Sequence, residues 1–335
     1  MSTILNSEIA EVTIEPLEGG TNKVSVKLND DSQFLSVSEC ETAYSLELIK
    51  IIIKVKGPVG LCQEIIRDEK HEYVEMALRY DLLGYVDSEL FKGKTILDFG
   101  CGAGSSTMIL ARMFPEAQIV GVELNKSVLK IANARIDFYQ CKNVSFCSSP
   151  SPDKLPSDLA EFDYIVLSAV YEHFLPGERQ NLFPQIWSHL KLGGVLFLDQ
   201  TPYRYFPVET HTSALPFINY LPDRLAHIYA TRFSKRKLHS KSWEVLLRCG
   251  IRGGTVKEVL SRLKGEDSVP KLMKPTGFGL KNRIDLWYIK MDRSKYARLK
   301  KVYNIFARVL YLLTKIELLP HLSLAIKKEA AACDS

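Results

Sequence analysis

The 335-residue sequence predicts an α/β protein with a mostly parallel central sheet and helices on both of its faces. Five apolar stretches are typical of buried strands and lie near 95–99, 118–123, 143–147, 162–167 and 194–199. Helical patterns alternate with them near 105–114, 125–138 and 177–191. Because a helical crossover returns the chain to the same end of the sheet, this alternation makes neighbouring strands parallel.

The composition is that of an ordinary globular protein, with 46% apolar and 25% charged residues. A net charge of +5 is too small to indicate a nucleic-acid partner, and the basic segment 232–241 is interpreted as a solvated loop. The seven cysteines show no metal-binding spacing. The N-terminus lacks the features of a signal peptide, and no apolar run is long enough for a membrane span. We therefore expect a cytoplasmic protein without a transmembrane segment.

An N-terminal extension over 1–90 precedes the alternating core. Alternating apolar residues at 11–15 and 23–28 predict a small hairpin. Helical patterns follow over 42–55 and 59–86. We expect this extension to pack as a lid over the ligand-binding side of the core.

The loop after the first core strand carries three glycines. Gly100, Gly102 and Gly104 remove side chains where the backbone turns sharply and approaches a ligand. The helix that follows presents its free N–H groups and the positive end of its dipole to that ligand. Asp98 lies at the end of the first strand, and Glu123 ends the second. The Glu123 carboxylate can accept hydrogen bonds from both hydroxyls of a ribose.

The spacing of the glycines argues against a dinucleotide as the ligand. The loop reads Gly-x-Gly-x-Gly, whereas the dinucleotide fingerprint Gly-x-Gly-x-x-Gly would need its third glycine at Ser105. Asp98 would oppose a pyrophosphate but suits an amino group. The ligand that combines an amino acid, a cation and a ribose is S-adenosylmethionine. Through residues 97–104 and 120–123 the sequence resembles the class I S-adenosylmethionine-dependent methyltransferases.

The resemblance implies a Rossmann-like class I methyltransferase fold, whose seven-stranded sheet is mostly parallel. It assigns residues 91–201 to the S-adenosylmethionine-binding core and 318–335 to a closing strand and tail. The segment 202–317 is then a long insertion after strand five that builds the acceptor pocket. Within it, 296–315 predicts an amphipathic helix. We expect this C-terminal helix to pack on its own domain, and peripheral contact with an anionic membrane is the alternative.

The resemblance also implies which residues bind the cofactor. They are Asp98, Gly100, Cys101, Gly102, Gly104, Glu123, Leu124, Ser148, Ser149 and Ser168. The family usually places an Asp after the third strand, where this sequence has two serines that accept a weaker bond from the adenine. Ser168 stands where amino-group methyltransferases often have Asn or Asp, which favours an oxygen or carbon acceptor.

Catalytic candidates are expected at the carboxyl ends of strands four and five. Strand four leads into Glu172 and His173, and strand five is soon followed by Glu209 and His211. A hydroxyl acceptor needs a group that takes its proton, and a histidine or carboxylate near the methyl group suits this task. We predict His173 or His211 as the base, with Glu172 or Glu209 orienting it. Bracing of the loop is the alternative role of Glu172 and His173.

A metal site is a further alternative for these residues. Some relatives hold a divalent ion through Glu-x-x-Glu-His and a distant His, but Ala169 replaces the first Glu here. Glu172, His173, Glu209 and His211 could still form a mixed nitrogen and oxygen site. Because one expected ligand is missing, we predict no metal.

The sequence therefore predicts an S-adenosylmethionine-dependent methyltransferase that acts on an oxygen of a small molecule or glycoconjugate. The aromatic residues of the insertion suit a flat or apolar acceptor, such as a phenol, a polyketide or a sugar. A non-catalytic S-adenosylmethionine-binding scaffold subunit is one alternative. A nicotinamide-dependent oxidoreductase is another, although the glycine spacing argues against it.

Overall fold

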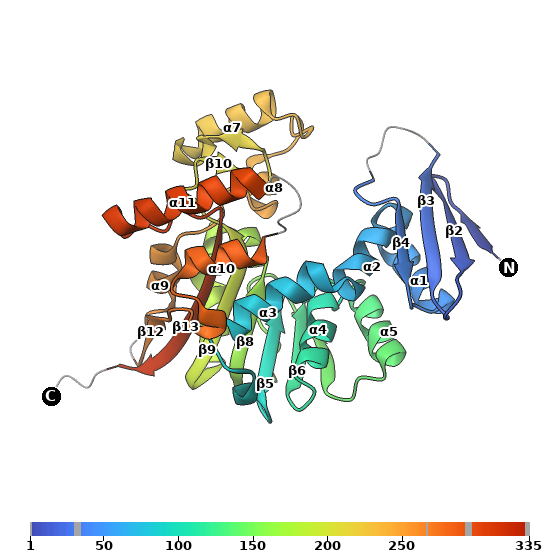
Figure 1. The fold of residues 1–335 in the computed structure, drawn as a ribbon, viewed down its shortest axis with the longest axis horizontal. Coiled ribbons are helices and arrows are strands. Elements are labelled where there is room, and N and C mark those ends of the chain that lie inside the picture. Colours follow the sequence, from blue (N-terminus) through green and yellow to red (C-terminus); the bar gives the residue numbers. More distant parts are fainter. Residues whose placement is uncertain (1, 30–34, 266, 292–296, 332–335) are drawn as a thin grey trace. The chain divides into compact units, whose positions relative to one another are not determined.

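The computed structural model describes residues 2–29, 35–265, 267–291 and 297–331. The chain forms two compact units, which we call unit 1 and unit 2 (Figure 1). Unit 1 combines Met1–Leu78 with Gly100–Ser149, and unit 2 combines Arg79–Phe99 with Pro150–Ser335. The glycine-rich loop therefore belongs to unit 1, whereas all four catalytic candidates belong to unit 2.

A seven-stranded sheet confirms the predicted fold class. Its strand order is β12 (Ser268–Leu272), β13 (His321–Ala330), β9 (Leu190–Pro202), β8 (Phe162–Ser168), β5 (Thr95–Phe99), β6 (Gln118–Glu123) and β7 (Val144–Ser148). The pairs β5–β8, β8–β9 and β6–β7 are parallel. Strand β13 is antiparallel to both of its neighbours. The sheet is thus mostly parallel, and an antiparallel pair closes it.

Strand β12 corrects the expected extent of the insertion. We predicted one insertion over 202–317, but β12 lies inside that range and pairs with β13. The strand was missed because it is short and contains Pro270, which disfavours a central strand. Proline is tolerated at the edge of a sheet, and β12 occupies that position. Two shorter segments therefore leave the sheet, one before β12 and one between β12 and β13.

The N-terminal extension forms a small sheet followed by helices. Its antiparallel strands are β1 (Thr3–Asn6), β2 (Ala10–Pro16), β3 (Asn22–Leu28) and β4 (Glu39–Thr42). The predicted hairpin corresponds to β2 and β3. Ala10, Val12 and Ile14 of β2 are buried and alternate with more exposed residues, so one face of this sheet is apolar.

Unit 1 also contains helices, of which those over 46–56, 61–69 and 129–139 contribute to the apolar cluster of that face. The helices are α1 (Leu46–Lys56), α2 (Leu61–Glu69), α4 (Ser105–Met113) and α5 (Leu129–Tyr139), with the short turns η1 (Pro58–Gly60) and η2 (His71–Glu75). Helix α3 (Met76–Leu83) begins in unit 1 and ends in unit 2. Helix α1 begins after Ser45, whose side chain accepts from the N–H of Leu48, and ends at Gly57.

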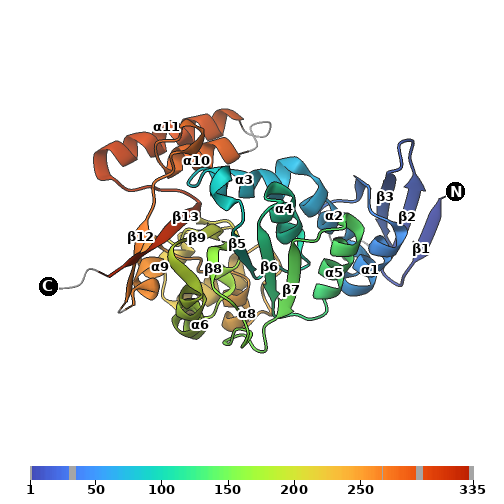
Figure 2. The ribbon, with the colours of Figure 1, turned by 90° about the horizontal axis from the view of Figure 1, so that it is seen from below.

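Unit 2 adds helices around its five strands of the large sheet. They are α6 (Pro176–Ser188), α7 (Asp223–Phe233), α8 (Trp243–Arg248), α9 (Val256–Leu263), α10 (Arg283–Lys290) and α11 (Ala297–Thr314). Short helical turns are η3 (Ser88–Phe91), η4 (Tyr171–His173), η5 (Ile218–Tyr220) and η6 (Gly277–Gly279). A two-stranded ribbon of β10 (Val208–Glu209) and β11 (Leu215–Pro216) brackets His211. Helices α10 and α11 lie side by side in both views (Figures 1 and 2).

The periodicity of 296–315 predicts a buried apolar face at Leu299, Val302, Tyr303, Phe306, Leu310 and Leu313, but helix α11 leaves most of this face exposed. More than half of each side chain is exposed at Leu299, Val302, Phe306 and Leu313. Asn304 and Ala307 are buried instead, and Tyr303 packs edge-on against Trp287 of α10. The periodicity predicted the helix correctly, but the docking face is set by the surface that α10 offers. Within the part of the chain that the structure describes, no helix has the length and hydropathy of a membrane span.

A buried arginine connects the N-terminal extension to the glycine-rich loop within unit 1. Arg135 of α5 has no exposed surface, and its Nη1 donates to the carbonyl of Ala103 at 2.6 Å and to Oε1 of Glu64 at 3.0 Å. Its Nε lies 3.3 Å from Asp68 and donates to the hydroxyl of Tyr44 at 2.9 Å. Burial alone would raise the pKa of Glu64, but the positive charges of Arg135 and Lys56 lower it to about 2. This ion pair therefore stabilises unit 1 above pH 4.5, and the stabilisation is lost as the pH falls toward 2.

Replacing Arg135 with methionine should lower the free energy of unfolding by about 3–5 kcal/mol, because Glu64 and Asp68 would lose a buried cationic partner. Arg112 also pairs with Asp68, but its side chain is partly exposed, so Arg112→Met should cost only about 1 kcal/mol. Urea unfolding followed by circular dichroism measures both changes. Equal losses of unfolding free energy in the two variants would contradict a special role of the buried guanidinium of Arg135.

Candidate active site

The glycine-rich loop in unit 1 has a backbone shape that other residues rarely adopt. Gly100, Gly102 and Gly104 have φ angles of 74°, 55° and 83°. A Cβ at Gly104, which precedes α4, would lie 2.9 Å from side-chain atoms of Ala132 and Phe146. A Cβ at Gly102 would meet no described atom within 4 Å. One side of the loop is therefore closely packed, and the other is open to a ligand.

Glu123 ties the end of β6 to this loop. Its Oε2 accepts a hydrogen bond from the N–H of Gly102 at 2.9 Å, and its Oε1 accepts one from the N–H of Asn125 at 2.8 Å. The side chain is only partly buried. Since each carboxylate oxygen has a second lone pair, Glu123 keeps acceptor capacity for the hydroxyls of a ribose.

The other cofactor candidates of unit 1 also lie at strand ends. Ser148 ends β7, and the N–H of Ser149 donates to the carbonyl of Glu123 at 2.9 Å. Leu124 is exposed directly after β6, and Cys101 is buried in the loop. This placement is the one that the sequence predicts, while the contacts of these residues with a cofactor stay predictions.

The two cofactor candidates in unit 2 lie on β5 and β8. Asp98 is buried on β5, and Ser168 ends β8 and donates to Oδ2 of Asp199 at 3.2 Å. Burial and the nearby Asp81 raise the pKa of Asp199 well above its ordinary value, although Lys290 opposes the shift. Lys290 donates to both oxygens of Asp81, at 2.6 and 2.8 Å. The hydroxyl of Ser168 is therefore part of a buried network that our sequence analysis missed.

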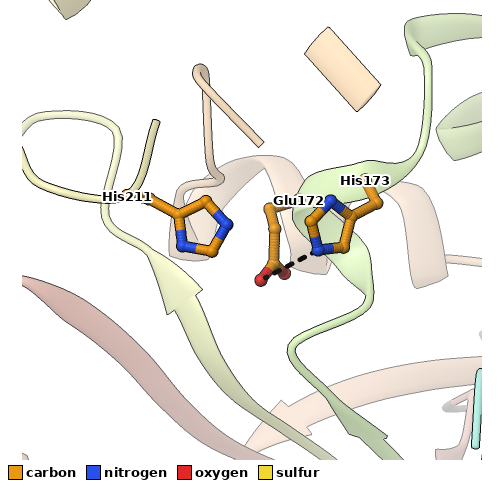
Figure 3. Close-up of side chains that lie close together, drawn as sticks. All are labelled: Glu172, His173 and His211. Atoms are coloured by element: carbon orange, nitrogen blue, oxygen red, sulfur yellow. Dashed lines mark ion pairs between the residues drawn. The ribbon is translucent and has the colours of Figure 1, made fainter. Parts of the chain in front are cut away.

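Three of the four catalytic candidates come together in unit 2. Glu172 and His173 belong to η4 after β8, and His211 follows β10 (Figure 3). One possible ligand atom of each residue lies within 4.8 Å of the others. The centroids of the two imidazole rings are 5.7 Å apart. The segments after β8 and β9 thus bring their histidines to the same place, as the sequence predicts.

Glu172 is fully buried but only half paired. Its Oε2 accepts a hydrogen bond from the hydroxyl of Thr201 at 2.9 Å, whereas Oε1 has no hydrogen-bond partner in the described structure. Burial raises the pKa of Glu172, and His173 opposes that shift. Because an unsatisfied buried carboxylate oxygen is costly, this position suits a proton, a cation or a donor group of a substrate.

The ring of His173 is held in one tautomer. Its Nδ1 lies 2.6 Å from the carbonyl oxygen of Arg248. A carbonyl can only accept, so Nδ1 carries the proton and the neutral ring has its lone pair on Nε2. That nitrogen lies 3.8 Å from Oε1 of Glu172. The structure therefore directs the basic nitrogen toward the buried carboxylate, while the side chain keeps 41% of its surface exposed.

Glu209 has a different role from the one we predicted. Its carboxylate accepts from the backbone N–H groups of His211 at 2.7 Å and Thr212 at 2.8 Å, and from the hydroxyl of Ser213 at 2.6 Å. It therefore holds the loop that carries His211 instead of bonding to the imidazole. Burial and the neighbouring His173 lower the pKa of His211, which keeps that ring neutral at more acidic pH.

A third histidine near this cluster was not predicted. His321 begins β13, and burial, Lys290 and His211 lower its pKa to about 4. It reaches this position because β13 pairs with β9, where His321 lies opposite Pro202. The only sequence signal was a histidine at the start of the closing strand.

Glu172, His173 and His211 could also hold a divalent ion. Two imidazole nitrogens and one carboxylate oxygen form a common ligand set for transition metals. Glu209, the fourth ligand that we considered, is already committed to its loop. The predicted absence of a metal therefore stays a prediction.

Comparisons with known proteins agree with the loop geometry. Residues 96–194 match a family model described as a methyltransferase domain. Trans-aconitate 2-methyltransferase of Azoarcus sp. is 32% identical over 131 residues, which cover 37% of this chain and 45% of that protein. The protein of the same name from Deinococcus radiodurans is 26% identical over 243 residues, which cover 67% and 87%. A solved structure of the plantazolicin methyltransferase BpumL in complex with SAH aligns with a TM-score of 0.44 and 14% identity, covering 84% of this chain and 95% of that chain.

The matches concentrate on one part of the chain. The chain spans less than half of the length of the first curated relatives that it matches, between 25% and 45%. The family model covers strands β5, β6, β7 and β8 together with the glycine-rich loop. S-adenosylmethionine is the cofactor of such domains, and the open loop with Glu123 fits its nucleoside. Residues 96–194 are therefore a methyltransferase domain that is similar to the class I S-adenosylmethionine-dependent methyltransferases.

Proposed function

We propose that the protein transfers the methyl group of S-adenosylmethionine to an oxygen atom of a small-molecule acceptor. The observation that carries the oxygen assignment is His173, whose free Nε2 faces a buried carboxylate, because a hydroxyl acceptor must lose a proton. The relatives named for trans-aconitate support a small molecule as acceptor. A sugar-containing acceptor is the alternative.

The cofactor would be held in unit 1 by the glycine-rich loop and Glu123. When bound, S-adenosylmethionine supplies an electrophilic methyl group for in-line displacement. Glu123 would accept hydrogen bonds from the ribose hydroxyls. The free N–H groups at the start of α4 would face the carboxylate of the methionine part. The binding of its amino group by Asp98 stays a prediction.

The acceptor proton would move to unit 2. Nε2 of His173 takes it, while the carbonyl of Arg248 keeps Nδ1 protonated. The resulting imidazolium is stabilised by Glu172 at 3.8 Å. His211 stays neutral because its pKa is lowered, so it can hydrogen-bond the acceptor without repelling a cationic cofactor.

A peripheral membrane contact is a further proposal for α11. Its exposed apolar residues recur every three or four positions at Leu299, Val302, Phe306, Val309 and Leu313. The helix also carries Arg298, Lys301 and Arg308, and it has no acidic residue. An apolar stripe next to cations suits an anionic membrane surface.

A cytoplasmic location is also proposed, because none of the six described cysteines forms a disulfide.

Replacing Glu123 with glutamine should weaken S-adenosylmethionine binding about tenfold, because the charge-assisted bonds to the ribose would be lost. Glu15→Gln, an exposed change in the same unit, is the matched control and should leave binding unchanged. Calorimetric titration with S-adenosylmethionine and S-adenosylhomocysteine measures both. Unchanged affinity of the Glu123 variant would remove this residue from the site. Binding by the wild-type protein without tritiated-methyl transfer to any acceptor would favour the scaffold alternative.

Replacing His173 with glutamine should lower the rate of methyl transfer by about 10²–10⁴-fold and leave cofactor binding unchanged, because the proton acceptor is lost. The loss in His173→Gln should appear in kcat more than in KM, because the proton acceptor is lost and not a binding contact. His211→Gln should change KM more than kcat. Tritiated-methyl transfer across pH measures these effects.

If the His173 and His211 variants both keep the full rate at neutral and acidic pH, neither histidine is the base. Loss of wild-type activity after chelation, restored by a divalent ion, would instead assign the cluster to a metal.

Replacing Phe306 and Leu313 together with aspartate should abolish any sedimentation with vesicles that contain phosphatidylserine, because both side chains lie on the exposed apolar stripe. Arg224→Asp on α7 changes an exposed charge elsewhere in unit 2 and serves as control. Equal sedimentation of all three proteins would show that α11 is not a membrane contact.

A further inference from the structure

A cavity of about 720 Å³ lies within unit 2 beside the segment that carries Glu172 and His173. Phe174, the residue after His173, forms part of its wall, together with Tyr203 and Tyr205 from the segment after β9. Arg179 of α6 also lines the cavity and donates to the backbone carbonyl of Glu172 at 3.3 Å. The volume is that of a typical small-molecule site.

The wall of this cavity has an excess of positive charge. Five of its side chains are cationic: Arg179, Arg204, Arg252, Lys257 and Arg262. Only two are acidic: Asp223 and Glu258. Both acids are already paired within the protein, since Glu258 lies 3.1 Å from Arg179 and Asp223 lies 2.6 Å from Arg252.

The other three cations have no acidic partner. Arg204, Lys257 and Arg262 form no ion pair with any described residue. The Nε of Arg262 is buried and donates to no acceptor in the described structure. Burial lowers the pKa of Arg252, and the like charge of Arg204 adds to this effect. An unsatisfied guanidinium nitrogen is costly, and a planar oxyanion is the ligand that satisfies it best.

We propose that this cavity binds the acceptor through a multiply charged oxyanion group, a carboxylate or a phosphate, with Arg204 and Arg262 as its main contacts. Lys257 adds a third positive charge, and the rings of Tyr203 and Tyr205 cover the carbon skeleton of the ligand. This inference rests on the proposed function, because it names the acceptor class of the proposed reaction. It narrows the phenols, polyketides and sugars expected from the sequence to acceptors that carry an anionic group.

The test uses citrate and inorganic phosphate as probes for the two sources of negative charge. Calorimetric titration at constant ionic strength should show that the wild-type protein binds at least one of them. Arg262→Gln and Arg204→Gln should each weaken that binding about tenfold or more. Arg298→Gln removes the same charge from the exposed start of α11 and should have no effect. Binding of citrate alone would identify a carboxylate site, and binding of phosphate alone a phosphate site.

Titration with S-adenosylmethionine reports whether each variant is folded, and all three variants should match the wild type. Failure of both probes to bind, or equal binding by Arg262→Gln, Arg204→Gln and wild type, would overturn the proposal. Because no methyl transfer is measured, this failure is distinct from a failure of the proposed activity. Anion binding by a protein that transfers no methyl group would keep the cavity assignment and reject the enzyme.

Discussion

The buried guanidinium of Arg135 is the interaction on which the cofactor loop depends. It donates to the carbonyl of Ala103, inside the loop, and pairs with Glu64 from the N-terminal extension. A loop carbonyl in the interior needs such a donor, because it would otherwise be left without a hydrogen bond. The extension therefore has a structural function at the back of the loop, besides the lid role that stays a prediction.

The glycine-rich loop is closely packed on the side of α5, and this packing explains the glycine at position 104. Gly104 has a positive φ and lies against Ala132 and Phe146, so any side chain there would push the loop away from α5. On the opposite side of the loop, the carboxylate of Glu123 accepts a hydrogen bond from the N–H of Gly102 and so fixes the loop there as well. A loop held on both sides is ordered before its ligand arrives, which lowers the entropy cost of binding.

The sequence predicted those features that depend on neighbouring residues. The glycine spacing, the strand ends and the positions of most core helices follow from local patterns, and so does the placement of Glu123. The two Glu-His sets looked equivalent in sequence, yet the structure separates them. Oε1 of Glu172 has no hydrogen-bond partner among the described residues, whereas Glu209 folds onto the N–H groups that follow it.

Features that depend on distant segments were missed. Strand β12 is recognisable only beside β13, and His321 approaches His211 only because β13 pairs with β9. The docking face of α11 depends on α10 in the same way. The cationic cavity combines Arg204 after β9 with Arg262 of α9, and nothing in the sequence relates these two positions.

In the proposed reaction, burial of Glu172 would favour an arrangement in which its charge is neutralised. Before transfer, a carboxylate at this position is a fully buried negative charge, which is unfavourable and raises the pKa of Glu172. Once Nε2 of His173 is protonated, the two side chains form an ion pair whose net charge is zero. In the proposed transfer, the proton would thus reach an arrangement in which the charge of Glu172 is neutralised, and the carbonyl of Arg248 would leave Nε2 as the nitrogen that accepts it. A solvated glutamate would lack this effect, because water already stabilises its charge. A glutamate at the position of Glu209 would also lack this effect, because four hydrogen bonds from its own loop already stabilise the carboxylate.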